Sequence, residues 1–185
     1  KARGYKVFMT RRIDKYRTLK YRTKYANNKK ADLFISIHAN AVPKKKRNRI
    51  YGIETYYLSP ARSERAKRVA AKENKADIKS MSYGTKNVFL MTQNRAKITA
   101  SNKLALDVQN NMLHNLKKKY KYIKDNGVRK GPFWILVGAQ MPSILIEVGY
   151  ISHPRESKRL YTSSYQNTLA TGIANGIDSY FLKNK

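Results

Sequence analysis

The sequence predicts an α/β fold in which helices flank both faces of a mostly parallel central sheet. Two short apolar segments, residues 33–37 and 143–149, are typical of strands that are covered on both faces, as in parallel sheets. Segments with apolar residues at helical spacing separate and follow them. Strands that alternate with helices in this way indicate an α/β domain, and 185 residues suit a single one.

The first half of the chain alternates between predicted strands and helices. Residues 6–10 are short and apolar and predict a strand, and a helix follows through about residues 19–30. The segment 31–40 is a strand that places His38 near its carboxyl end, and residues 53–58 form the next strand. Ser59 and Pro60 then start a helix that runs to about residue 79, because Ser caps a helix and Pro fits its first turn.

Two helices, each with an apolar face, are predicted in the second half of the chain. A helix from about residue 98 and a final helix over about 165–182 each carry apolar residues four apart: Leu104, Val108, Met112 and Leu116 in the first, and Leu169, Ile173, Ile177 and Phe181 in the second. Between them, Asn126-Gly127 indicates a turn and residues 133–137 an apolar strand or buried segment. His153-Pro154 starts a short helix before the final one.

The composition is strongly basic. Forty Lys and Arg against eleven Asp and Glu give a formal net charge of +29, which favours a polyanionic partner such as an anionic envelope surface or nucleic acid. The cations are scattered along the chain, and no known nucleic-acid-binding motif accompanies them. One run, Lys44, Lys45, Lys46 and Arg47, follows the His38 strand; it is either part of an ordinary solvated surface or a group that steers an anionic polymer toward the strand end. No run of about 20 apolar residues exists that would span a membrane.

His38 and Glu147 are the residues whose setting most suggests chemistry. Open α/β sheets place their ligands at the carboxyl ends of strands, where His38 is expected. Glu147 lies within an apolar strand, where a carboxylate needs a partner or a function. A hydrogen-bonded structural histidine and an ion-paired structural carboxylate explain the same pattern. From the residues alone, two interpretations therefore remain: a metal-assisted hydrolase, or a structural histidine and a structural carboxylate without catalytic function.

An ordered series of motifs adds a resemblance. The series comprises Thr10-Arg11, Asp14, Leu19, Arg22, Ala26-Asn27, Ala31-Asp32, Ser36-Ile-His-Ala-Asn40, Gly52-Ile-Glu-Thr-Tyr56 and Met141-Pro-Ser-Ile-Leu-Ile-Glu-Val-Gly-Tyr-Ile-Ser152. It resembles the zinc-dependent N-acetylmuramoyl-L-alanine amidases, which cut peptidoglycan between N-acetylmuramic acid and the first L-alanine of the stem peptide. The resemblance implies that His38 is a zinc ligand and that Glu147 is the catalytic general base and acid.

The resemblance also has gaps. The family's first zinc ligand, a His in a Gly-His-Gly loop, and a Glu ligand on the following helix are not found in this sequence. We therefore expect residues 1–185 to form one zinc-amidase catalytic domain that is incomplete at its amino terminus, with those two ligands and any signal peptide upstream. A smaller departure is His153, where the family more often has Asn.

Residues about 61–100 form a candidate regulatory insert. In family members from bacteria with an outer membrane, a helical segment here can occlude the zinc site until an activator protein displaces it. Glu64 and Glu73 are the Glu residues of this segment that could cap the zinc, and the sequence does not choose between them. An ordinary covering helix is the other interpretation. The resemblance places the protein in the cell envelope, in the periplasm of such a bacterium.

Two functions from other classes remain open at this point. One is a non-catalytic module that holds anionic cell-wall glycan on the amidase scaffold without cleaving it. The other is a basic nucleic-acid-binding protein, which the net charge alone supports and which we do not expect.

Overall fold

The computed structural model describes residues 3–59, 64–74 and 95–184. Across these ranges a four-stranded sheet has the order β1-β4-β2-β3, with β1 at Phe34–Asn40, β2 at Ile53–Leu58, β3 at Asp125–Gly131 and β4 at Ser143–Tyr150. β1 pairs with β4 and β2 with β3 in parallel, whereas β2 and β4 are antiparallel. The prediction of an α/β fold with a mostly parallel sheet is confirmed.

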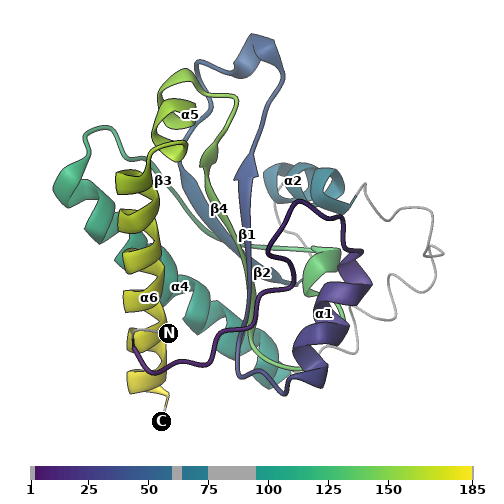
Figure 1. Ribbon diagram of the computed structural model, residues 1–185. Helices are drawn as coiled ribbons and strands as arrows, with labels where there is room; N and C mark the ends of the chain where they lie inside the picture. The colour runs from purple at the N-terminus through teal and green to yellow at the C-terminus, as the bar shows by residue number, and fades with distance from the viewer. Residues whose placement is uncertain (1–2, 60–63, 75–94, 185) are drawn as a thin grey trace.

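Helices cover both faces of the sheet, as Figure 1 shows. One face packs against α1 and α2, which span Leu19–Asn28 and Glu64–Asn74. The other packs against α4 and α6, which span Arg95–Lys119 and Ser163–Lys183. A short helix, α5 (Pro154–Leu160), follows β4, and two 3-10 turns complete the described elements: η1 (Lys44–Lys46) and η3 (Trp134–Leu136). None of the helices in the described ranges has the length and apolar character needed to cross a membrane.

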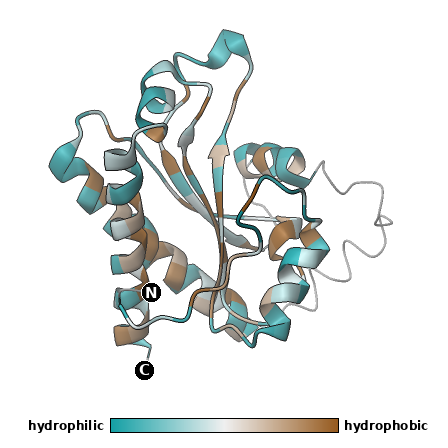
Figure 2. Cartoon of the chain, in the orientation of Figure 1, coloured by the Kyte–Doolittle hydropathy of each residue, from teal (hydrophilic) through white to brown (hydrophobic). Residues whose placement is uncertain are grey.

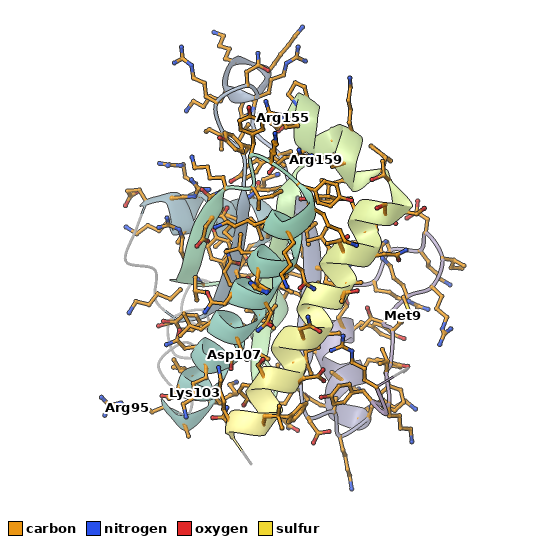
Figure 3. The ribbon with its side chains drawn as sticks, turned by 90° about the vertical axis from the view of Figure 1, so that its left-hand side faces the viewer. Met9, Arg95, Lys103, Asp107, Arg155 and Arg159 are labelled. Atoms are coloured by element: carbon orange, nitrogen blue, oxygen red, sulfur yellow. The ribbon has the colours of Figure 1, made fainter. Side chains whose placement is uncertain are left out.

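The interface between α4 and α6 is unusually close. A Cβ added to Gly172 would lie 2.6 Å from the Cα of Met112, and one added to Gly176 would lie 2.4 Å from the Cα of Val108. The backbones of α4 and α6 are therefore so close that a residue larger than glycine would not fit at Gly172 or Gly176. Figure 3 shows the two helices side by side, with Asp107 of α4 near the end of α6, where it forms an ion pair with Lys183.

Two local predictions need correction. Residues 6–10 form no strand, because this run pairs with no strand of the described sheet and leaves Val7 and Met9 46% and 55% exposed. For residues 133–137, the second of the two predicted alternatives holds: they form a buried segment around the 3-10 turn η3. The turn expected at Asn126-Gly127 lies inside β3: the Asp125 carboxylate accepts from the Gly127 backbone N–H, and the pairing with β2 shifts register there.

The helix predictions agree with the structure where residues are described. His153 caps α5, and the two apolar stripes of α4 and α6 face the sheet. The candidate insert at 61–100 is described only over α2 and the start of α4, so residues 60–63 and 75–94 lie outside the described residues. Figure 2 shows that η1, the basic turn after β1, is hydrophilic throughout.

Candidate active site

His38, Glu147 and Glu54 lie in one row across the sheet. His38 of β1 is paired in register with Glu147 of β4, which is paired on its other side with Glu54 of β2. Residues in one row of a sheet project to the same face, here the face that α1 and α2 cover. The sheet therefore brings an imidazole and two carboxylates together near the carboxyl ends of β1 and β4, where α/β folds bind their ligands.

Both ring nitrogens of His38 have a partner. Its Nδ1 lies 2.7 Å from a carboxylate oxygen of Glu73, and its Nε2 lies 2.9 Å from the Ser36 hydroxyl oxygen. Burial raises the pKa of Glu73, but the hydrogen bond and charge of His38 and the charge of Lys72 outweigh it, so the pKa of this carboxyl is below its ordinary value. Glu73 belongs to the last turn of α2, and the helix thus reaches directly over the strand end.

The structure separates the two glutamates of the 61–100 segment. Glu73 contacts His38, whereas Glu64 is exposed and pairs with Lys67 one turn further along α2, at 2.7 Å. Of these two carboxylates, only Glu73 is therefore placed to reach a metal ion at His38.

Glu147 is a buried carboxylate without a partner. Its side chain is fully buried, and neither carboxylate oxygen has a hydrogen-bond partner among the described residues. Burial raises the pKa of Glu147 to about 8, the charges of Glu73 and Glu54 add to this rise, and Lys72 opposes it. A carboxyl whose pKa lies near neutrality can both accept and return a proton, which is the property a general base needs.

Stability is therefore expected to fall with rising pH through Glu147. Because its pKa in the folded chain, about 8, exceeds the ordinary 4.5, the folded state binds more protons than the unfolded state between these pH values. The free energy of unfolding of the metal-free protein should decrease between pH 5 and pH 8, by up to roughly 4 kcal/mol from this group. Urea unfolding in the presence of a chelator measures it, and Glu147→Gln should flatten the profile; equal slopes for both proteins would contradict the assignment.

Glu54 has the opposite environment, with four partners around a fully buried carboxylate. It accepts from the Arg65 Nε at 3.0 Å, the Tyr150 hydroxyl at 3.0 Å and the Asn40 side-chain amide at 3.5 Å, and Arg129 lies at 3.9 Å. Arg65 also donates to the Tyr150 hydroxyl, at 3.0 Å. No role was predicted for Glu54, although it lies in an apolar strand, which is the signal that singled out Glu147. This network fixes α2 against β2 and β4.

His38 and Glu73 suit two positions of a zinc site. Zinc binds nitrogen and oxygen at about 2.0–2.2 Å in a tetrahedron, which sets two ligand atoms roughly 3.3 Å apart. The 2.7 Å between the His38 Nδ1 and the Glu73 oxygen needs only a small widening to match this. The described residues contain no group of three metal ligands, however.

The remaining histidines lie elsewhere. His153 caps α5 through its Nδ1, which accepts from the Glu156 backbone N–H, and its ring packs against Tyr51. His114 is exposed on α4, which covers the other face of the sheet. Of the three histidines, His38 alone stands in the row with Glu147 and Glu54.

The basic run after β1 is exposed, and one member turns toward the site. Lys44, Lys45 and Arg47 are solvent-exposed, whereas Lys46 is also among the residues that line a pocket of about 320 Å³ between the loop after β1 and α2. Asn40, two residues after His38, lines the same pocket.

Comparison with known proteins identifies the family of this chain. A family model described as N-acetylmuramoyl-L-alanine amidase matches residues 1–179. The chain is 33% identical over 184 residues to the N-acetylmuramoyl-L-alanine amidase AmiC of Escherichia coli O6:H1, covering 95% of this chain and 42% of that protein. It is 31% identical over 182 residues to AmiA of Salmonella typhimurium, covering 96% and 62%.

A solved structure agrees with the sequence comparisons. The N-acetylmuramoyl-L-alanine amidase AmiC2 of Nostoc punctiforme superposes with a TM-score of 0.67 and 28% identity, covering 98% of this chain and 75% of that one. The chain spans less than two thirds of the two curated relatives named above. Because the family model covers nearly the whole chain and the fold superposes on that of a solved amidase, the chain belongs to the N-acetylmuramoyl-L-alanine amidase family.

Proposed function

We propose that this protein is a peptidoglycan hydrolase that cleaves the amide bond between N-acetylmuramic acid and the L-alanine of the stem peptide. The observation that carries the proposal is the buried, unpartnered Glu147 beside His38 at the carboxyl ends of two paired strands, in a chain of this family. Such a substrate lies outside the cytoplasmic membrane, and we place the protein in the cell envelope, in the periplasm of a bacterium with an outer membrane.

The proposed cofactor is one zinc ion held by the His38 imidazole together with ligands from outside the described residues. When bound, zinc lowers the pKa of a water molecule and polarises the amide carbonyl. Glu147 takes a proton from the attacking water and returns it to the departing alanine nitrogen. Ser36 holds the second nitrogen of His38, which fixes the orientation of the ring.

The test is an analysis of the bond that is cut. The full-length protein is incubated with purified peptidoglycan and zinc, and the soluble products are examined by mass spectrometry. We expect stem peptides that begin with a free L-alanine amino group and glycan strands that keep the lactyl group. Cleavage at another bond would contradict the proposal. Saturable binding without any released peptide would identify the non-catalytic wall-binding module instead.

We further propose that residues about 61–100 act as a regulatory insert within this single catalytic domain, with Glu73 as an inhibitory cap on the zinc. Its carboxylate already touches His38, and α2 carries it over the strand end. An activator protein that draws Glu73 away from His38 would uncover the metal, while the ion pair between Arg65 and Glu54 would keep the rest of α2 in place. Without an activator, Glu73→Gln should raise the rate of peptide release severalfold, because an amide is a weaker zinc ligand than a carboxylate. The exposed Glu64→Gln is the matched control, and equal rates for wild type and both variants would make α2 an ordinary covering helix.

A further inference from the structure

A basic pocket adjoins the candidate active site without being part of it. Its volume is about 320 Å³, and it lies between the loop after β1 and one face of α2. In Figure 1, α2 stands beside the upper end of β1, from which that loop leaves the sheet. Arg65, Arg68 and Lys72 of α2 line it at helical spacing, and Lys46 of η1 lines it from the loop.

The pocket holds positive charge that the described residues do not neutralise. Among the described residues, no acidic side chain lines it. Arg65 is balanced by the buried Glu54, whereas Lys72 donates only to the uncharged backbone carbonyl of Ala41, at 3.2 Å. Lys46 and Arg68 have no ion pair with any described residue. Lys46, Arg68 and Lys72 therefore line one hollow without an ion pair to any described residue, and an anion placed there would be attracted by all three.

The pocket lies close to His38 and Glu147, measured along strands β1 and β4. Asn40 and Tyr150, which line it, follow His38 by two residues and Glu147 by three. At about 3.3 Å per strand residue, this is roughly 7–10 Å, the length of two to three residues of an extended peptide. The charge of Lys72 also acts on Glu147 and Glu73, which shows that the pocket and the site are neighbours.

We propose that this pocket binds the free carboxylate on the second residue of the stem peptide, so that the enzyme prefers substrates that carry an acid there. The proposal rests on the amidase function proposed above. Arg68 offers a planar pair of donors that matches a carboxylate, and Lys46 and Lys72 add point charges. Val42, Pro43 and Val69 give the pocket an apolar part for the aliphatic portion of the residue.

The test compares two synthetic substrates that differ in one group. In both substrates the γ-carboxyl of the second residue is linked to a third residue, L-lysine: muramoyl-L-alanyl-γ-D-glutamyl-L-lysine keeps the free α-carboxylate on its second residue, and muramoyl-L-alanyl-D-isoglutaminyl-L-lysine has an uncharged amide in its place. With the zinc-loaded full-length protein, the ratio of kcat/KM for acid over amide should be about 10 or more, the value of one charge-assisted contact. Arg68→Gln should reduce the ratio severalfold. Lys67→Gln removes the same charge from an exposed position of α2 and should leave the ratio unchanged.

A binding measurement separates this proposal from the amidase function. The dipeptide L-alanyl-D-isoglutamate, which has no scissile bond, is titrated calorimetrically into wild type and Arg68→Gln. Two results would contradict the proposed role of the pocket and leave the amidase function intact. The first is hydrolysis of both substrates at equal kcat/KM, and the second is an acid-over-amide ratio in Arg68→Gln that equals that of wild type. Failure to hydrolyse either substrate, with dipeptide binding that Arg68→Gln weakens, overturns the amidase function and supports the pocket. Absence of both hydrolysis and dipeptide binding overturns both.

Discussion

Replacement of Glu147 by Gln is expected to lower kcat for amide hydrolysis by at least about a hundredfold. Gln keeps the shape of the side chain but cannot accept a proton from water at neutral pH. Burial raises the pKa of Glu147 to about 8 and thereby makes its carboxylate a stronger base, and the Gln variant lacks this base. Release of stem peptides from purified peptidoglycan by the full-length protein measures the effect.

The control for this variant is its stability and metal content. Because Glu147 has no partner among the described residues, Gln should be tolerated, and at pH 8 the variant should unfold at a higher urea concentration than wild type. Zinc content should match that of wild type, since Glu147 is proposed to move protons and not to hold the metal. Near-normal turnover in Glu147→Gln would remove this residue from the mechanism.

The second large effect is expected at Arg65. Arg65→Ala leaves the fully buried Glu54 with the more distant Arg129, at 3.9 Å, as its remaining cationic partner. A buried charge that loses its partner costs about 3–5 kcal/mol, and we expect a value near the lower end because Tyr150 and Asn40 still donate to Glu54. The free energy of unfolding by urea should therefore fall by about 3 kcal/mol.

Two further variants make this prediction specific. Lys67→Ala removes an exposed cation from the same helix and should cost less than about 1 kcal/mol. Glu54→Gln in the Arg65→Ala background should recover part of the loss, because the double variant no longer buries an uncompensated charge. An Arg65→Ala cost no larger than that of Lys67→Ala, or strictly additive effects of Arg65→Ala and Glu54→Gln, would contradict the network.

The sequence predicted the fold best where the local pattern was strong. The two apolar segments form the strands β1 and β4, and β4 is buried throughout as predicted, whereas β1 is an edge strand that leaves Ile37 59% exposed. The four-residue spacing in α4 and α6 predicted the faces that pack on the sheet. It failed at residues 6–10, since a strand depends on a partner that periodicity does not reveal. It failed at β3 because Asn126-Gly127 is a local turn signal, yet the strand pairs with β2 around that turn.

Two residues of the candidate site could be identified from the sequence, but the contacts among the site residues could not. His38 stands out by its place near a strand end, and Glu147 stands out as a carboxylate within an apolar strand. Glu54 was missed because its partners Arg65, Tyr150 and Arg129 come from three separate segments. The same holds for Glu73: its sequence context resembles that of Glu64, and only the rotation of α2 decides which of the two reaches His38.

A calorimetric titration of zinc into the full-length protein and two histidine variants tests whether His38 binds the metal at the edge where β1 and β4 end. Wild type and His114→Ala, which loses an exposed imidazole on the opposite face, should bind one zinc ion with submicromolar affinity, as a site with three protein ligands does. His38→Ala should bind at least about a hundredfold more weakly. Equal affinity in His38→Ala and wild type would show that His38 is not a zinc ligand and would contradict the account.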